Sequence, residues 1–220
     1  MKGNNESRQK ETARLEAFSD GVFSIAITLL VLELIQFLHP QNGESVFTFA
    51  FHNWEPFLAF VIGFVTILVC WINHHHAFDY INKVDSNFMW VNGFLLFLVT
   101  LTPLPTAILA EFLRTEGKAA IVIFGFNYFM IALAAYCICA YAYKKLLVEE
   151  ESRDFFYCVT LTYRYSIFYT FFAFAVCFFS IAAAIILYMI LFFVFAFPKE
   201  FASRVLKIKN RKITNRQIQS

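Results

Sequence analysis

The chain has 220 residues, of which 60% are hydrophobic and 15% are charged, and its formal net charge is +2. So few charged residues cannot cover the surface of a soluble domain of this size, and the near-neutral balance gives no sign of a nucleic-acid partner. Several apolar runs reach the roughly 20 residues that a helix needs to cross a membrane, so we expect an all-α, multi-pass integral membrane protein.

The apolar runs predict six membrane-spanning helices. Residues 1–13 are polar and show no cleavable signal sequence, so we expect a cytoplasmic N-terminal segment. Spans are predicted at residues 15–38, 56–76, 88–113 and 119–143. Residues 166–197 contain no charge, glycine or proline, but a single helix there would extend about 48 Å, too far for one bilayer. We therefore expect a short fifth helix and a sixth, with a reversal near residues 179–182.

The positions of Lys and Arg predict that both termini are cytoplasmic. Four basic residues precede the first span and seven follow Pro198, whereas residues 39–55 contain none. Two cytoplasmic termini require an even number of crossings, which favours six, in one transmembrane domain at residues 14–198. Arg114 and Lys118 are the exception, since their loop would be external. Residues 199–220 would form a basic tail that sets this orientation or contacts anionic lipid.

The first span has two different faces. At about 100° per residue, Ile25, Leu29 and Leu32 form one aliphatic stripe, and Thr28 lies beside them. Asp20 points about 140° away from Ile25. A carboxylate facing lipid costs about 2.5–3.5 kcal/mol, so Asp20 needs partners inside the bundle. The stripe by itself favours lipid contact or packing, and a pore lining remains the alternative.

We expect Asp20 to join a hydrogen-bonded network at the cytoplasmic ends of three helices, because histidine, asparagine and indole groups lie at similar depth. The predicted members are Arg14, Phe18, Ser19, Asp20, Trp71, Asn73, His74 and Asn92.

A metal or catalytic site built from Asp20 and the histidines at 74–76 is the weaker alternative. Consecutive histidines point about 100° apart, zinc needs three or four converging ligands, and we expect no second membrane carboxylate nearby. The five cysteines lie in or beside apolar runs and are interpreted as buried thiols, so no metal site is predicted.

The stretch RLEAFSD, from Arg14 to Asp20, resembles the arginine–three residues–FSD signature of the endosomal/lysosomal transmembrane potassium-channel family and its bacterial homologues. The stretches WINHHH at 71–76 and TPLPT at 102–106, with Asn92, are similar to that family's second and third helices. The resemblance covers residues 14–110. It implies a pore lined by four first helices, with Ile25, Leu29 and Leu32 as a hydrophobic constriction and Thr28 as a selectivity layer.

The resemblance also implies a homotetramer in a bacterial plasma membrane, in contact with lipids, that conducts K⁺ passively and with modest selectivity. Such a channel is not an enzyme and needs no cofactor. The alternative from the residues is a proton-coupled secondary transporter or a proton-leak channel that uses Asp20 and His74. A transporter predicts internal repeats, and we see none in the sequence. An intramembrane enzyme would need converging catalytic groups beyond this pair.

Overall fold

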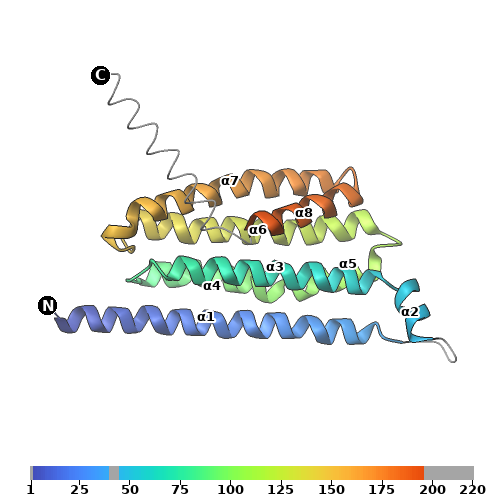
Figure 1. The fold of residues 1–220 in the computed structure, drawn as a ribbon, viewed down its shortest axis with the longest axis horizontal. Helices are drawn as coiled ribbons and strands as arrows, with labels where there is room; N and C mark the ends of the chain where they lie inside the picture. Colours follow the sequence, from blue (N-terminus) through green and yellow to red (C-terminus); the bar gives the residue numbers. More distant parts are fainter. Residues whose placement is uncertain (1, 40–44, 196–220) are drawn as a thin grey trace, which may run out of the picture.

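The computed structural model describes residues 2–39 and 45–195, and its regular elements are helical (Figure 1). The elements are α1 (Lys2–Gln36), α2 (Val46–His52), α3 (Glu55–Phe78), α4 (Ser86–Leu101), α5 (Pro103–Phe112), α6 (Gly117–Lys144), the 3₁₀ turn η1 (Glu150–Ser152), α7 (Arg153–Cys177) and α8 (Ile181–Phe195). The predicted basic tail and residues 40–44 of the predicted external loop lie outside the described residues. The all-α architecture agrees with the prediction.

The long helices lie side by side along one axis (Figure 1). Helix α1 follows one edge, α3, α4 and α5 occupy the middle, and α6, α7 and α8 form the opposite edge, while α2 lies across one end. Helix α1 packs against α3, α4 and α5, and α6 packs most extensively against α7. As a result, α1 is covered by the rest of the chain on one side only.

Four helical segments are long and apolar enough to cross a membrane: Lys10–Gln36, Glu55–Phe78, Ser86–Phe112 and Gly117–Lys144. They correspond to the first four predicted spans. Within the described ranges, α7 does not belong to this set, and Ile181–Phe192 is a shorter apolar helix. The six-crossing topology therefore stays a prediction.

The prediction of a short fifth helix is wrong. Helix α7 has 25 residues and begins at Arg153, well before the uncharged run. Its polar residues do not interrupt it, because hydroxyls such as those of Thr160 and Thr170 donate to carbonyls of their own helix. The chain then reverses at residues 178–180, where Ser180 Oγ accepts from the Ala183 N–H and caps α8. The reversal lies one residue from the predicted position.

The third predicted span is divided by Pro103, which has no N–H to continue the helical ladder. Thr102 joins the two parts in a helical conformation, and its hydroxyl donates to the Leu98 carbonyl at 3.2 Å. Asn127 Nδ2 of α6 donates to the same hydroxyl oxygen at 3.1 Å. Side chains thus replace backbone hydrogen bonds at membrane depth, where water is absent.

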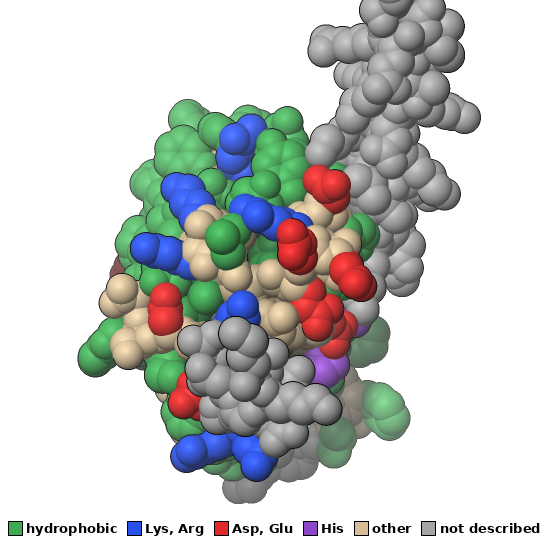
Figure 2. Space-filling model, turned by 90° about the vertical axis from the view of Figure 1, so that its left-hand side faces the viewer, with side chains coloured by type: hydrophobic (Ala, Val, Ile, Leu, Met, Phe, Trp, Pro, Cys, Tyr) green, Lys and Arg blue, Asp and Glu red, His purple; other side chains and the backbone are tan. Residues whose placement is uncertain are grey.

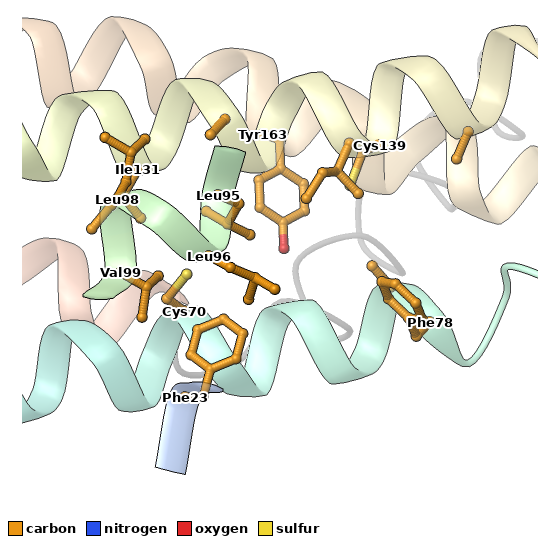
Figure 3. Packing of buried hydrophobic residues seen from close by; sticks show 14 of the residues in the cluster. Phe23, Cys70, Phe78, Leu95, Leu96, Leu98, Val99, Ile131, Cys139 and Tyr163 are labelled. Carbon is orange, nitrogen blue, oxygen red and sulfur yellow. The ribbon is translucent and has the colours of Figure 1, made fainter. Parts of the chain in front are cut away.

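Two clusters of buried apolar side chains fill the bundle. Figure 3 shows part of one, in which α1, α3, α4, α6 and α7 meet and the Tyr163 ring points inward from α7. The second joins α3, α5, α6, α7 and α8 around residues such as Phe124 and Tyr188. The five cysteines are free thiols, and four are buried as expected, whereas Cys137 is exposed.

The two turns α3–α4 and α6–η1 lie at the same end of the bundle and are tied together. Ile81 and Val148 form an isolated antiparallel bridge, and Asn82 N–H donates to the Leu147 carbonyl at 3.0 Å. Lys, Arg, Asp, Glu and His side chains gather over this end, while apolar side chains surround it (Figure 2). This distribution is typical of a bundle end that lies in water.

Candidate functional site

One side of α1 faces the bundle. Ser19, Phe23, Ala26 and Leu30 follow each other at intervals of three or four residues and are at most 1% exposed. That spacing places them on one helix face, which packs against α3, α4 and α5. This face positions the helix.

The predicted aliphatic stripe lies on the other side of α1. The exposed fractions are 60% for Ile25, 36% for Leu29 and 55% for Leu32, and Thr28 is also exposed. The Thr28 hydroxyl donates its hydrogen to the Ile25 carbonyl at 2.8 Å. Its oxygen lone pairs are therefore left to face outward. The roles of Ile25, Leu29 and Leu32 as a constriction and of Thr28 as a selectivity layer remain a prediction.

Three buried polar side chains connect α1, α3 and α4. Asn92 Nδ2 donates to Ser19 Oγ at 2.9 Å, and Ser19 Oγ donates to the Leu15 carbonyl at 2.8 Å. Asn92 Oδ1 lies 2.8 Å from His74 Nε2. Because Asn92 Oδ1 can only accept, His74 carries its hydrogen on Nε2. The His74 ring packs between those of Phe78 and Phe23, with centroid separations of 4.4 and 5.3 Å.

Asp20 has a different partner from His74. The indole Nε1 of Trp71 donates to Asp20 Oδ1 at 2.9 Å, and the carboxylate is half-buried between α1 and α3. Asp20–Trp71 and Ser19–Asn92–His74 are two separate hydrogen-bonded groups. The proton relay from Asp20 to His74 that a transporter would use therefore has no direct hydrogen bond between its two groups in the described structure.

The other three predicted network members do not belong to these two groups. Arg14 is exposed, Phe18 is 63% exposed, and Asn73 Nδ2 donates to the Val69 carbonyl of its own helix. Helical geometry explains this result, since Arg14 and Phe18 point about 120° and 160° away from Asp20. The structure brings together Ser19, Asp20, Trp71, His74 and Asn92.

Sequence reasoning missed a second carboxylate beside the histidines, and the expectation that none would lie there is wrong. His75 Nδ1 lies 3.1 Å from Glu16 Oε1. Ligand atoms of Glu16, Asp20 and His75 all lie within 4.8 Å of one another. The signal was the four-residue spacing of Glu16 and Asp20, which places both on one face of α1.

At the opposite end of the bundle, the contacts of Arg114 explain why this basic residue lies in a loop that the positive-inside rule predicts to be external. Its guanidinium Nε pairs with Glu55, which is 5% exposed, and a terminal nitrogen donates to the His52 carbonyl. A buried carboxylate requires a partner, so Arg114 is placed by Glu55 of α3. This contact joins the end of α2 to the start of α3 and the end of α5.

The chain is similar to proteins of one family. The family model described as endosomal/lysosomal potassium channel TMEM175 matches residues 14–103. A potassium channel from Chamaesiphon minutus is 38% identical over 177 residues, which cover 79% of this chain and 87% of that protein. A potassium channel from Streptomyces collinus is 38% identical over 124 residues, or 56% of this chain and 60% of that protein.

The fold is similar as well. The crystal structure of a lysosomal potassium-selective channel TMEM175 homolog from Chamaesiphon minutus has a TM-score of 0.77 and 35% identity, and the match covers 87% of this chain and 99% of that one. The matched family segment contains α3, α4 and α1 from residue 14 onward, which carry the buried Ser19–Asn92–His74 connection. The chain, a multi-pass membrane protein, therefore belongs to the TMEM175 family.

Proposed function

We propose that this protein is a potassium-selective ion channel of modest selectivity, in which α1 of each of four identical chains lines a central pore. Ions move passively down their electrochemical gradient. The relatives named potassium channels, at 38% identity, support this activity. The alternatives, a proton-coupled transporter or a proton-leak channel, would use Asp20 and His74, but in the described structure these side chains bond to Trp71 and Asn92 and not to each other.

The observation that carries the proposal is the uneven burial of α1. In the most apolar window of α1, 22% of residues are buried, compared with 50% in the α4–α5 span. The uncovered side holds Ile25, Leu29 and Leu32, inside the segment that matches the family model. A single chain has one such helix, so a closed pore needs several chains, and four is the number that the family resemblance implies.

The stripe provides a mechanism for gating. Four copies of each aliphatic side chain would form a narrow apolar constriction, which conducts when it is wet and closes when water leaves it. The Thr28 hydroxyl donates its hydrogen to the Ile25 carbonyl, so its oxygen lone pairs are available to ligate a partly dehydrated cation weakly. Weak, exchangeable ligation gives modest selectivity for K⁺ over Na⁺.

The buried contacts position the pore helix. Ser19, Asp20 and their partners on α3 and α4 hold one face of α1 in the bundle, which leaves the opposite face directed at the pore axis. In this proposal the conspicuous carboxylate of Asp20 orients the helix and does not contact the permeant ion.

We place the channel in a bacterial plasma membrane, with six crossings and both termini in the cytoplasm. The positive-inside rule and the charged bundle end in Figure 2 support this orientation. Cysteine labelling of intact cells tests it: Thr115→Cys, at an exposed position of the α5–α6 turn, reacts with an impermeant thiol reagent from outside, and Asp85→Cys does not. Both are made in a Cys137→Ser background, because Cys137 is exposed. The reverse pattern would contradict the orientation.

Flux through proteoliposomes tests the function. Purified protein is reconstituted, and K⁺, Na⁺ and H⁺ fluxes are compared under a clamped potential. We expect K⁺ flux to exceed Na⁺ flux and to persist without a proton gradient. Leu29→Ala should widen the constriction and raise flux, and Thr28→Ala should lower the K⁺/Na⁺ ratio. Val31→Ala is the matched control, since Val31 is 43% exposed but lies about 120° from Ile25.

Two outcomes would contradict the proposal. Saturable K⁺ uptake that requires a proton gradient would favour the transporter. Unchanged flux and selectivity in both Leu29→Ala and Thr28→Ala proteins would remove α1 from the pore. Chemical cross-linking of the reconstituted protein gives the number of chains, and a dominant species other than a tetramer would reject the four-chain arrangement.

A further inference from the structure

We propose that Glu16, Asp20 and His75 form a binding site for a divalent transition-metal ion of the zinc class. The site lies between α1 and α3 at the charged end of the bundle. It is separate from the pore stripe, which occupies the other side of α1, and it does not depend on the channel function.

The three side chains already converge. Their ligand atoms lie within 4.8 Å of one another, and His75 Nδ1 is 3.1 Å from Glu16 Oε1. In a tetrahedral zinc site with bonds of about 2.0–2.1 Å, neighbouring ligand atoms are about 3.3 Å apart. The histidine–glutamate pair therefore has the ligand spacing of such a site, and the Asp20 ligand atom lies within 4.8 Å of both.

Trp71 contacts two of the three proposed ligands, Asp20 and His75, and fixes their orientation. Its indole Nε1 donates to Asp20 Oδ1, which leaves Oδ2 for a metal. Its ring stacks on the His75 ring with a centroid separation of 5.8 Å and an interplanar angle of 21°. Outer contacts of this kind orient metal ligands and raise affinity. Glu16 and Asp20 are one turn apart on α1, so the backbone fixes their separation.

The charges and the free imidazole nitrogen of this site favour the binding of a cation. Two carboxylates at i and i+4 repel each other, and a metal ion between them removes that repulsion. His75 Nδ1 is shielded from solvent and makes no hydrogen bond, although it lies next to Glu16. The side chains of His75 and Glu16 remain 44% and 27% exposed, so an ion can reach them from water.

The donor set selects the metal. One imidazole nitrogen with two carboxylates suits Zn²⁺ and similar ions, whereas Ca²⁺ and Mg²⁺ prefer oxygen ligands throughout. Three protein ligands leave a fourth position for water. A bound ion would tie the inner end of α1 to α3, close to the hydrogen bond between Ser19 and Asn92.

Direct metal binding tests the proposal. The protein is purified without a histidine tag and with Cys137→Ser, which removes the exposed thiol, and is equilibrated with Zn²⁺ or Co²⁺. We expect about one tightly bound ion per chain and a tetrahedral Co²⁺ absorption spectrum. Glu16→Gln, Asp20→Asn and His75→Gln should each weaken the affinity about tenfold or more.

The controls separate loss of ligands from loss of structure. Asp20→Asn keeps an oxygen acceptor for Trp71, so it removes a metal ligand while preserving the helix contact. His76→Gln changes the neighbouring histidine, whose Nδ1 faces Asp79, and it should bind the ion as the parent does. Absence of saturable binding or of a tetrahedral Co²⁺ spectrum in the parent protein would overturn the proposal. Equal affinity in the parent and all three ligand variants would also overturn it.

Discussion

The two sides of α1 use different chemistry. The side packed against α3 and α4 combines polar side chains with directional hydrogen bonds, Ser19 to Asn92 and Asp20 to Trp71, and closely packed apolar residues. The uncovered side carries the aliphatic stripe of Ile25, Leu29 and Leu32, with Thr28 beside it. Lipid is as apolar as a protein interior, so a leucine in a membrane helix does not reveal whether it is buried, whereas a carboxylate or an asparagine does. The polar residues therefore mark the side that anchors the helix.

Two phenylalanines on α1 provide the test with the largest expected effect. Phe23 is 1% exposed and packs on the His74 ring at 5.3 Å, whereas Phe18 is 63% exposed. We expect Phe23→Ala to lower the free energy of unfolding by about 3 kcal/mol, because it leaves a cavity in the bundle. Phe18→Ala should change it by less than about 0.5 kcal/mol. Thermal unfolding in one detergent compares them, and equal losses would contradict the assignment of the two faces.

Substitutions of Asp20 separate its charge from its hydrogen bond. Asp20→Ala leaves the Trp71 indole N–H without its acceptor, and we expect a loss of about 2 kcal/mol and a lower yield of assembled protein. Asp20→Asn keeps an acceptor and should retain most of the yield. Size-exclusion chromatography measures assembly. An assembled Asp20→Ala protein with altered ion selectivity would instead place this carboxylate in the ion path.

Ser19 and Ser24 form a matched pair on the same helix. Each hydroxyl donates at 2.8 Å to the carbonyl four residues earlier, but only Ser19 also accepts from Asn92 across the helix interface. Ser19→Ala should therefore cost about 1–2 kcal/mol, since it orphans a buried amide donor. Ser24→Ala is expected to be nearly neutral. Chemical denaturation of both variants measures the difference, and similar values would show that the interhelical bond contributes little.

A small effect on stability is also expected for the aliphatic stripe on the uncovered side. Leu29→Ala removes a side chain that is 36% exposed, so the free energy of unfolding should fall by less than about 1 kcal/mol while the ion flux rises. Parallel measurements of unfolding and flux on the same preparation check this. A large loss of stability without a change in flux would indicate that the stripe packs against another chain and does not line a pore.

Much of the fold follows from patterns along the chain. Apolar length located the first four spans, and the absence of charge over residues 166–197 predicted a reversal close to the observed one. The start of α7 was not predictable from hydropathy, because its hydroxyls are satisfied by the helix backbone and the helix extends into a charged segment. The division of the third span at Pro103 could be anticipated from proline chemistry, but the supporting contact from Asn127 could not.

The candidate site divides in a similar way. Helical angles placed Asp20 away from the aliphatic stripe, and depth brought Ser19, His74 and Asn92 to one level. The same angles show that the side chains of Arg14 and Phe18 point away from Asp20. The pairing of Glu16 with His75, and of Arg114 with Glu55, joins residues 59 positions apart in sequence. No local pattern selects such partners, because many carboxylates and cations are available at similar depth.

The sequence by itself determined that the chain crosses a membrane, which residues of the first helix are apolar and which must be satisfied internally, and that its motifs are those of the TMEM175 family. These properties depend on composition, helical period and the cost of moving a charge into hydrocarbon. Only the tertiary structure decided which donor meets which acceptor, where the predicted fifth span (α7) begins, and that a second carboxylate, Glu16, lies beside His75. Those choices depend on the depth and rotation of each helix against its neighbours, which are set by packing and hydrogen bonds between the helices.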